Sequence, residues 1–393
     1  MKEPKIRFKG FSGEWEETPF SEIVNRTSAS ASSSLYPGVE FEDINSGEGT
    51  LNKDVRRKKI VKTGTQFSKG DVLFGKLRPY LKNILLADFK GVAIGDFWVL
   101  KPQKVTSELL YILLNSREFM RIANISSGSK MPRADWNLVS CSPFTFPNAK
   151  EEQLSLGAYF QHLDSLIQST TKKIESLKQV KAASLQSMFP QEGETTPRVR
   201  FKGFVCQWKK VRLSEILVER HESSTITPEL PQLSFTIADG VIRPEDRKSN
   251  QRDFLIKDKD NKRYLVSRVG DIIYNPANVV YGAIHRNSLI DGVVSPIYRI
   301  FSTEQDSRFM ECVVRRPSFI SKLAMKTEGT VTKLKTLKPE AFLDMTVCIP
   351  TDVVEQKMIG EYFTSLDRQI SLQTQRLEKL KQIKSACLDN MFV

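Results

Sequence analysis

The sequence contains an internal duplication, and this feature constrains the fold more than any other. Residues 7–11 (Arg-Phe-Lys-Gly-Phe) recur unchanged as residues 200–204, and Trp15 and Ser-Glu-Ile 21–23 recur at the same offset. Further along, Gly70-Asp-Val-Leu-Phe returns as Gly270-Asp-Ile-Ile-Tyr. So ordered a series of matches predicts two copies of one structural unit.

Each copy ends in a segment with the composition of a long helix. Residues 151–189 contain no proline and one glycine, and good helix formers dominate. Asn148 with Glu151, and Asp352 with Glu355, have the spacing of a capping box, and Pro190 would end the first helix. We expect the helical segments to span 148–190 and 351–393.

Both helices carry the same seam, whose positions recur in alternating steps of four and three residues and are apolar except for polar breaks in the same places. Its apolar members are Leu163, Ile167, Ile174, Leu177 and Met188 in the first helix and Leu366, Ile370, Leu377, Leu380 and Met391 in the second. A heptad seam favours a partner helix, and the other copy is the nearest candidate. About 38 residues would form a rod of roughly 57 Å, so an antiparallel coiled coil would separate the two globular domains. The alternative is that each helix packs only on its own domain.

The remaining segments predict an α+β fold for each globular domain. Short apolar runs bounded by turn residues indicate strands; they are 71–74, 83–86, 97–100, 271–274 and 293–300. Residues 109–114 and 308–314 favour short helices. We therefore divide the chain into a first domain at 1–147, its helix at 148–190, a polar linker at 191–199, a second domain at 200–350 and its helix at 351–393.

The charge balance favours a polyanionic partner. There are 59 Lys and Arg residues against 46 Asp and Glu, which gives a formal net charge of +13. Nucleic acid is the leading candidate, although a generally basic surface without such a partner is the plain alternative. In the first copy the candidate contacts are Lys76, Arg78, Tyr80, Lys82, Lys130 and Arg133. In the second copy they are Asn275, Asn278, Tyr281, Lys333 and Lys335.

Several enzyme classes lack their required motifs in this sequence. There is no G-x-G-x-x-G, no P-loop and no Asp/Asn-Pro-Pro-aromatic motif, and the three histidines are too dispersed for a metal site. The five cysteines form no C-x-x-C pair, and nowhere do 18 apolar residues run together. We expect a cytoplasmic chain with no membrane span, metal, cofactor or catalysis of its own.

The ordered motifs resemble those of one known family, the specificity subunits of type I restriction-modification systems. The resemblance rests on the Arg-Phe-x-Gly-Phe opening of both halves, on residues 70–80 (Gly-Asp-Val-Leu-Phe-x-Lys-Leu-Arg-Pro-Tyr) and on Val294-Ser-Pro-Ile-Tyr298. The Pro…Glu-Gln…Phe…Leu-Asp…Ile order of the two helical segments completes it, so the resemblance spans nearly the whole chain.

This resemblance implies two target recognition domains, each reading one part of a bipartite site in double-stranded DNA. It also implies that the two helices fix the spacing between the two parts of the site and dock two methyltransferase subunits. Restriction subunits, where they exist, would join this complex. Residues 275–281 differ from residues 75–80, which indicates that the halves read different sequences. The alternatives are a stand-alone enzyme that acts on DNA and a coiled-coil adaptor without DNA specificity.

Overall fold

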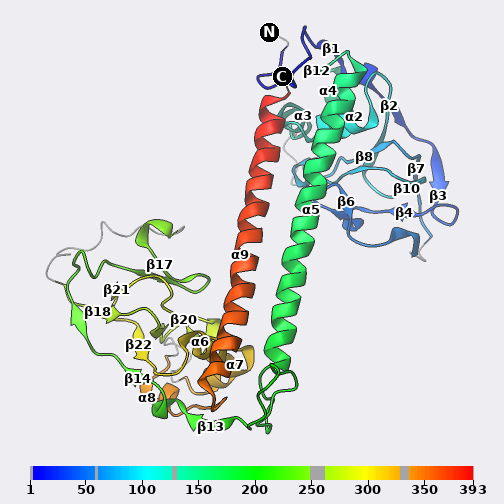
Figure 1. Ribbon diagram of the computed structural model, residues 1–393. Helices are drawn as coiled ribbons and strands as arrows, with labels where there is room; N and C mark the ends of the chain where they lie inside the picture. The colour runs from blue at the N-terminus through cyan, green and yellow to red at the C-terminus, as the bar shows by residue number, and fades with distance from the viewer. Residues whose placement is uncertain (1–2, 58–60, 126–130, 248–261, 328–335, 393) are drawn as a thin grey trace. The chain divides into compact units, whose positions relative to one another are not determined.

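A computed structural model describes residues 3–57, 61–125, 131–247, 262–327 and 336–392. The chain forms two compact units, drawn in Figure 1. Unit 1 comprises Met1–Lys173 and Gln373–Val393, and unit 2 comprises Ile174–Leu372. The compact units therefore divide each long helix between them, which is a different division from the linear one made on the sequence. The boundaries of the target recognition domains stay a prediction.

Unit 1 combines small sheets with short helices, as expected of an α+β domain. One four-stranded sheet has the order β2 (Val24–Thr27), β11 (Phe97–Pro102), β8 (Val72–Gly75), β9 (Ile84–Leu86). A second has the order β3 (Ser30–Ser32), β7 (Thr63–Phe67), β10 (Gly91–Ala93), β4 (Gly38–Val39). The two-stranded pairs are β1 (Glu16–Pro19) with β12 (Pro143–Phe146) and β5 (Ile44–Asn45) with β6 (Thr50–Leu51). The helices are α1 (Phe20–Ile23), α2 (Ser107–Asn115), α3 (Arg117–Ala123), α4 (Trp136–Cys141) and the first part of α5 (Lys150–Ser187).

Unit 2 repeats this plan with fewer residues in strands. Its main sheet has the order β14 (Val218–Glu219), β22 (Arg299–Ser302), β19 (Ile272–Tyr274), β20 (Ile284–Arg286). Beside it are β15 (Ser223–Ser224), β18 (Tyr264–Ser267) and β21 (Gly292–Val294), and the pairs β16 (Ser234–Thr236) with β17 (Gly240–Ile242) and β13 (Lys209–Arg212) with β23 (Thr346–Ile349). The helices are α6 (Ser307–Arg315), α7 (Pro317–Met325), α8 (Pro339–Leu343) and the first part of α9 (Val353–Asn390).

One strand prediction is wrong. Residues 293–300 were expected to form a single strand, but β21 ends at Val294 and β22 begins at Arg299. The two strands belong to different sheets. Pro296 lies in the break, and since proline cannot donate a backbone hydrogen bond it does not continue a central strand. The helices expected at 109–114 and 308–314 are present as α2 and α6.

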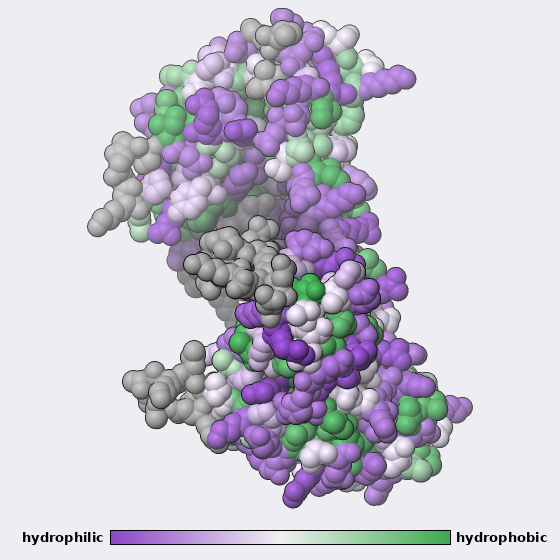
Figure 2. Space-filling view, turned by 90° about the vertical axis from the view of Figure 1, so that its left-hand side faces the viewer, coloured by the Kyte–Doolittle hydropathy of each residue, from purple (hydrophilic) through white to green (hydrophobic). Residues whose placement is uncertain are grey.

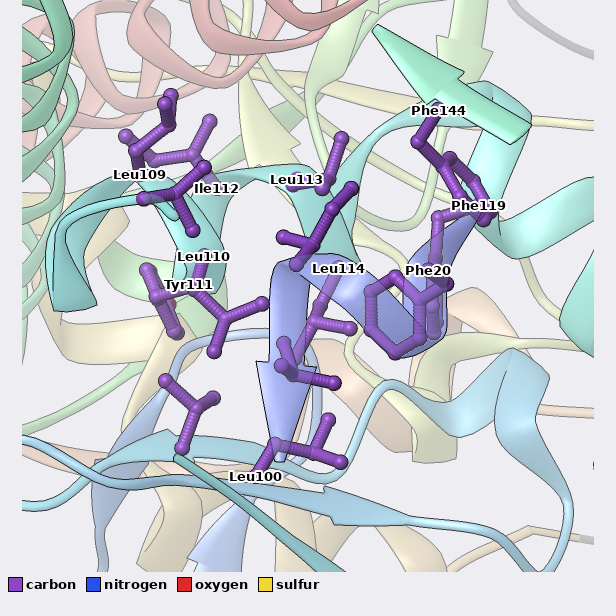
Figure 3. Close-up of a cluster of buried hydrophobic side chains, with 14 of the residues drawn as sticks. Phe20, Leu100, Leu109, Leu110, Tyr111, Ile112, Leu113, Leu114, Phe119 and Phe144 are labelled. Atoms are coloured by element: carbon purple, nitrogen blue, oxygen red, sulfur yellow. The ribbon is translucent and has the colours of Figure 1, made fainter. Parts of the chain in front are cut away.

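The core of unit 1 forms around α2. Thr106 caps this helix by accepting a hydrogen bond from the Leu109 backbone amide at 3.2 Å. Figure 3 shows the aliphatic side chains of α2 above Leu100 of β11, beside an aromatic group made by Phe20, Phe119 and Phe144. The ring centroids of this aromatic group lie 5.3–5.6 Å apart. In unit 2 the corresponding helix α6 is capped by Asp306.

The two long helices pack against each other in antiparallel directions within each unit. In unit 1 the first part of α5 lies beside the last part of α9 (Figure 1), and Tyr159 contacts Cys387 while Asp164 pairs with Lys384. In unit 2 the matching contacts join Tyr362 to Ser184 and Asp367 to Lys181. Seam residues Leu163, Ile167, Ile174, Leu177, Met188, Leu366 and Met391 are buried, and Ile370, Leu377 and Leu380 are half-buried.

A buried glutamine anchors the start of each long helix to its domain. Gln153 accepts a hydrogen bond from the Thr106 amide at 2.9 Å and donates one to the Pro147 carbonyl at 2.8 Å. Gln356 does the same with the Asp306 amide and the Pro350 carbonyl. The Glu-Gln pair of the sequence repeat therefore has a structural explanation, because its glutamine joins the helix to the cap of α2 or α6. Of the expected capping boxes, Asp352 does accept from the Val354 amide, but Glu355 binds Arg200 instead.

Candidate nucleic-acid interface

The loop between β8 and β9 holds four of the residues that the sequence singled out. It contains a short 3-10 helix, η3 (Pro79–Leu81), flanked by Arg78 at φ 51° and Lys82 at φ 51°. In the part of the chain that the structure describes, these two are the non-glycine residues with positive φ. A left-handed conformation costs such residues roughly 1–2 kcal/mol, and strain of this kind is found at functional sites more often than elsewhere.

This loop is tied by its backbone to the segment that precedes α4. The Arg78 amide donates to the Pro132 carbonyl at 2.8 Å, and the Ala134 amide donates to the Lys76 carbonyl at 2.8 Å. Two segments that are more than 50 residues apart in the sequence thus lie side by side. The structure therefore brings Lys76, Arg78 and Arg133 together.

Asp96 lies between two of these cations. Its carboxylate is 3.4 Å from Lys76 Nζ through Oδ1 and 2.8 Å from Arg133 Nη2 through Oδ2. We call Lys76, Arg78, Asp96 and Arg133 the basic cluster. Sequence reasoning missed Asp96, since a single acidic residue at a strand end carries no signal of its own until the three segments are seen together.

The side chains of this region are available to solvent. Arg133 is 60% exposed and Tyr80 is 55% exposed, and Arg78 is exposed as well. No other described residue forms an ion pair with the Arg78 guanidinium. Exposed arginine and lysine beside an aromatic ring can neutralise phosphates and contact base edges. Figure 2 shows one face of the molecule, where hydrophilic side chains predominate and hydrophobic ones are scattered.

Lys82 differs from the other candidates in this loop because its ammonium group is partly buried. Its Nζ lies 3.3 Å from the Asn115 carbonyl at the end of α2. Burial lowers the pKa of Lys82, nearby Lys384 lowers it further, and Asp389 opposes this. We infer that Lys82 supports the loop from the side of the long helices, whereas the basic cluster is exposed.

The second copy has a similar loop with different side chains, and Asn278 has φ -121° where Arg78 has φ 51°. Its loop contains η7 (Val279–Tyr281), ends at Gly282 with φ 87°, and receives a hydrogen bond from the Leu337 amide at the Pro276 carbonyl (3.1 Å). Asn275 accepts from the Ala277 amide through its side chain at 3.0 Å, so it shapes the turn. Asn278 is half-buried and Tyr281 is 72% exposed.

Three of the expected contact residues lie outside the described residues. They are Lys130, Lys333 and Lys335. The described residues near them, Pro132 and Leu337, form backbone hydrogen bonds with the two loops. These three residues stay sequence predictions.

The described residues offer neither a metal site nor a membrane-spanning helix. No group of three or more His, Cys, Asp or Glu side chains in the described ranges could hold a metal ion. None of the helices formed by described residues is long and apolar enough to cross a membrane.

Comparison with known proteins gives one curated relative and several solved structures. No family model matches the chain. The specificity subunit of the HindI type I restriction enzyme of Haemophilus influenzae is 28% identical over 45% of this chain. The match covers 41% of that relative, so the chain spans less than half of its length.

The fold comparison covers the whole chain. The type I restriction-modification S subunit of M. genitalium aligns over 100% of this chain and 99% of its own, with a TM-score of 0.64 and 12% identity. The HsdS subunit of Thermoanaerobacter tengcongensis aligns over 96% of each chain at 17% identity, with a TM-score of 0.42. The first alignment shows a common fold, with two α+β domains joined by two long antiparallel helices. The resemblance to the specificity subunits of type I restriction-modification systems is therefore confirmed, by sequence over part of the chain and by fold over all of it.

Proposed function

We propose that this chain is the DNA-recognition subunit of a type I restriction-modification complex. Each half would read one part of a bipartite site in double-stranded DNA, with residues 1–147 and 200–350 as the two target recognition domains. Each long helix has 38 residues and at 1.5 Å per residue is about 57 Å long. This length would set the spacing between the two parts of the site.

The observation that carries this proposal is the contrast between a repeated frame and a diverged loop. The anchoring glutamines Gln153 and Gln356 make the same hydrogen bonds in both halves. The loops after β8 and β19 share several backbone hydrogen bonds, but Lys76 and Arg78 stand where the second copy has Pro276 and Asn278. A shared frame with different exposed side chains is what a reader of two different half-sites requires.

The repeated frame also supports two like partners. Pseudo-symmetric surfaces can receive two copies of one subunit in equivalent ways. Between the long helices, a tyrosine contact and an Asp–Lys ion pair recur at equivalent positions of the two units. We propose two methyltransferase subunits as these partners, with restriction subunits added where the host has them. The chain would then act in the cytoplasm, without catalysis of its own.

The experiment is to map methylated bases in the host genome with and without this gene. The proposal expects one bipartite methylated motif that disappears on deletion and returns with the wild-type gene on a plasmid. A methylation pattern that does not change on deletion would overturn it. Methylation or cleavage of DNA by the purified chain, given only a methyl donor or a metal ion, would instead establish a stand-alone enzyme.

A second arm measures DNA binding by the chain together with its methyltransferase subunits. Each cation that contacts a phosphate adds about one unit to the slope of log affinity against log salt. Replacing Lys76, Arg78 and Arg133 with alanine should therefore flatten this slope. Unchanged half-site recognition in the triple variant would favour the coiled-coil adaptor.

A further inference from the structure

The two recognition loops can be aligned through the backbone hydrogen bonds that they share, although Arg78 and Asn278 differ in backbone conformation. The Gly75 amide donates to Asn83 O, and the Asn275 amide donates to Ala283 O. Likewise the Ala134 amide donates to Lys76 O, and the Leu337 amide donates to Pro276 O. Position 76 therefore matches 276, position 78 matches 278, and position 133 matches 336.

The neighbouring strands extend the match to Asp96. In unit 1, Val72 of β8 pairs with Leu100 of β11, and in unit 2, Ile272 of β19 pairs with Phe301 of β22. Counting back four residues from Leu100 and from Phe301 gives Asp96 and Ile297. By this register Ile297 is the counterpart of Asp96, and it is 60% exposed.

Every charged member of the basic cluster is replaced by a neutral residue in the second half. Lys76, Arg78, Asp96 and Arg133 correspond to Pro276, Asn278, Ile297 and Thr336. Loss of the carboxylate together with the cations indicates that the four side chains belong to one arrangement. The second half instead offers Asn278 and the exposed Tyr281 in the loop after β19, and the exposed Ile297 just before β22.

These two sets of side chains suit different base pairs. Arginine forms two hydrogen bonds with guanine O6 and N7, which is the commonest specific contact in the major groove. Asparagine forms the equivalent pair with adenine N6 and N7, and apolar side chains contact the thymine methyl group. A carboxylate that holds one end of an arginine lowers the entropy lost when the other donors bind a base.

We propose that the first half reads a guanine with Arg78 or Arg133, with Asp96 as the residue that positions Arg133, and that the second half reads an A·T pair with Asn278 and Ile297. This inference rests on the proposed function and specifies the chemistry of its two half-sites. It also makes the first half the main source of salt-dependent affinity among the described loops, because the cations gather there.

The test maps methylated motifs in strains that carry single variants of the full-length chain. Arg78→Lys and Arg133→Lys keep the charge but remove the two-pronged hydrogen bond. At least one of them should weaken the preference for guanine at one position of the motif, so that the ratio of guanine to other bases there falls by tenfold or more. The other half of the motif should stay unchanged. Asn278→Ala should relax an adenine position in the opposite half.

Asp96→Asn separates positioning from folding. This variant should relax the same guanine as Arg133→Lys and raise non-specific DNA affinity, because a negative charge is lost. A role in folding alone would lower affinity for all sequences equally. The matched control is Asp88→Asn, at an exposed position after β9, which should leave the motif unchanged.

The outcomes distinguish the inference from the function on which it rests. If the wild-type strain shows no bipartite motif, the proposed function fails. If the motif is present but both arginine variants leave every guanine position intact, or if Arg133→Lys and Asn278→Ala relax the same half, this inference fails and the proposed function stands. Co-purification of each variant with its methyltransferase subunits shows that it is folded.

Discussion

Arg200 donates two hydrogen bonds to the buried carboxylate of Glu355, from Nε to Oε1 at 2.5 Å and from Nη2 to Oε2 at 2.7 Å. The Glu355 side chain is fully buried and Arg200 is 13% exposed. In the first half, Arg7 binds Glu152 in the same way at 2.7 and 2.8 Å. The first residue of each Arg-Phe-Lys-Gly-Phe repeat therefore ties the start of its half to the start of the long helix that follows.

Arg200→Met should destabilise unit 2 by about 3–5 kcal/mol, because a buried carboxylate would lose its charged partner. Urea denaturation of the full chain, followed by hydrogen exchange in α9, measures this. The double variant Arg200→Met, Glu355→Met should recover most of the lost stability, because a buried apolar pair leaves no charge to be taken out of water. The control is Arg198→Met, whose residue is 67% exposed and 3.7 Å from Glu194, with an expected cost below about 1 kcal/mol. Equal losses at 198 and 200 would contradict the prediction.

Lys384 pairs with Asp164 at 2.5 Å, and Lys181 pairs with Asp367 at 2.5 Å, at equivalent positions of the two helices. The first pair is 14% and 15% exposed, and the second is 27% and 50% exposed. Burial raises the pKa of Asp164, an effect that Lys384 opposes. Asp164→Ala would leave the largely buried Lys384 ammonium without its carboxylate partner and should cost unit 1 about 2 kcal/mol, whereas Asp367→Ala, in the more exposed pair, should cost unit 2 less than about 1 kcal/mol. Hydrogen exchange in the last turns of α9 and α5 compares them, and a larger loss at Asp367 would refute this.

Periodicity and repetition were enough to predict the long helices and their mutual packing. Leu163 and Leu366 lie at matching heptad positions and both are buried, so the same heptad pattern in the two helices indicated that they share a seam. The clamp between Arg7 and Glu152 could not be predicted this way, because repetition shows that both residues are kept but not that they touch. The composition of the compact units was equally out of reach of repetition, since unit 1 joins Met1–Lys173 to Gln373–Val393, at the other end of the sequence.

The candidate interface was only partly accessible from the sequence. A run of cations around Tyr80 drew attention to the right loop, but composition does not show where each ammonium group points. Lys82 turns toward Asn115, whereas Arg133 joins Lys76 at Asp96. The matching of Asp96 with Ile297 required strand register, because the second copy has gained residues and simple counting misaligns the two halves.

Gly360 allows α9 to pass close to the cap of α6. A Cβ atom there would lie 2.6 Å from Asp306 Oδ1 and 2.9 Å from the Phe309 backbone nitrogen. Gly360→Ala should thus destabilise unit 2 by about 1–3 kcal/mol through overpacking, although alanine favours a helix by about 1 kcal/mol over glycine. Gly157→Ala is the matched variant, and it should cost less because its new Cβ would meet only side-chain carbons of Glu108. Urea denaturation measures both, and a stabilised Gly360→Ala chain would show the prediction to be wrong.

His285 should make unit 2 sensitive to mild acid. The ring is 4% exposed, its Nε2 lies 2.8 Å from the Ile237 carbonyl, and its neighbours include Glu311, Arg315 and Asp239. Burial lowers the pKa of His285, Arg315 lowers it further, and the Ile237 carbonyl and the two carboxylates only partly oppose this. The folded chain therefore binds this proton less readily than the unfolded chain does.

The sign of the pH effect follows from this difference in proton binding. As pH falls through about 6.5, the usual pKa of histidine, the unfolded state takes up the proton first and the stability of unit 2 falls, by at most about 1.4 kcal/mol per pH unit. His285→Gln should flatten the stability profile between about pH 7.5 and pH 5.5, a range that brackets that pKa, because glutamine does not titrate. His221→Gln, at a 77% exposed position of the same unit, should keep the wild-type slope. Urea denaturation across this pH range decides the matter, and a slope that survives in His285→Gln would assign the acid sensitivity to other groups.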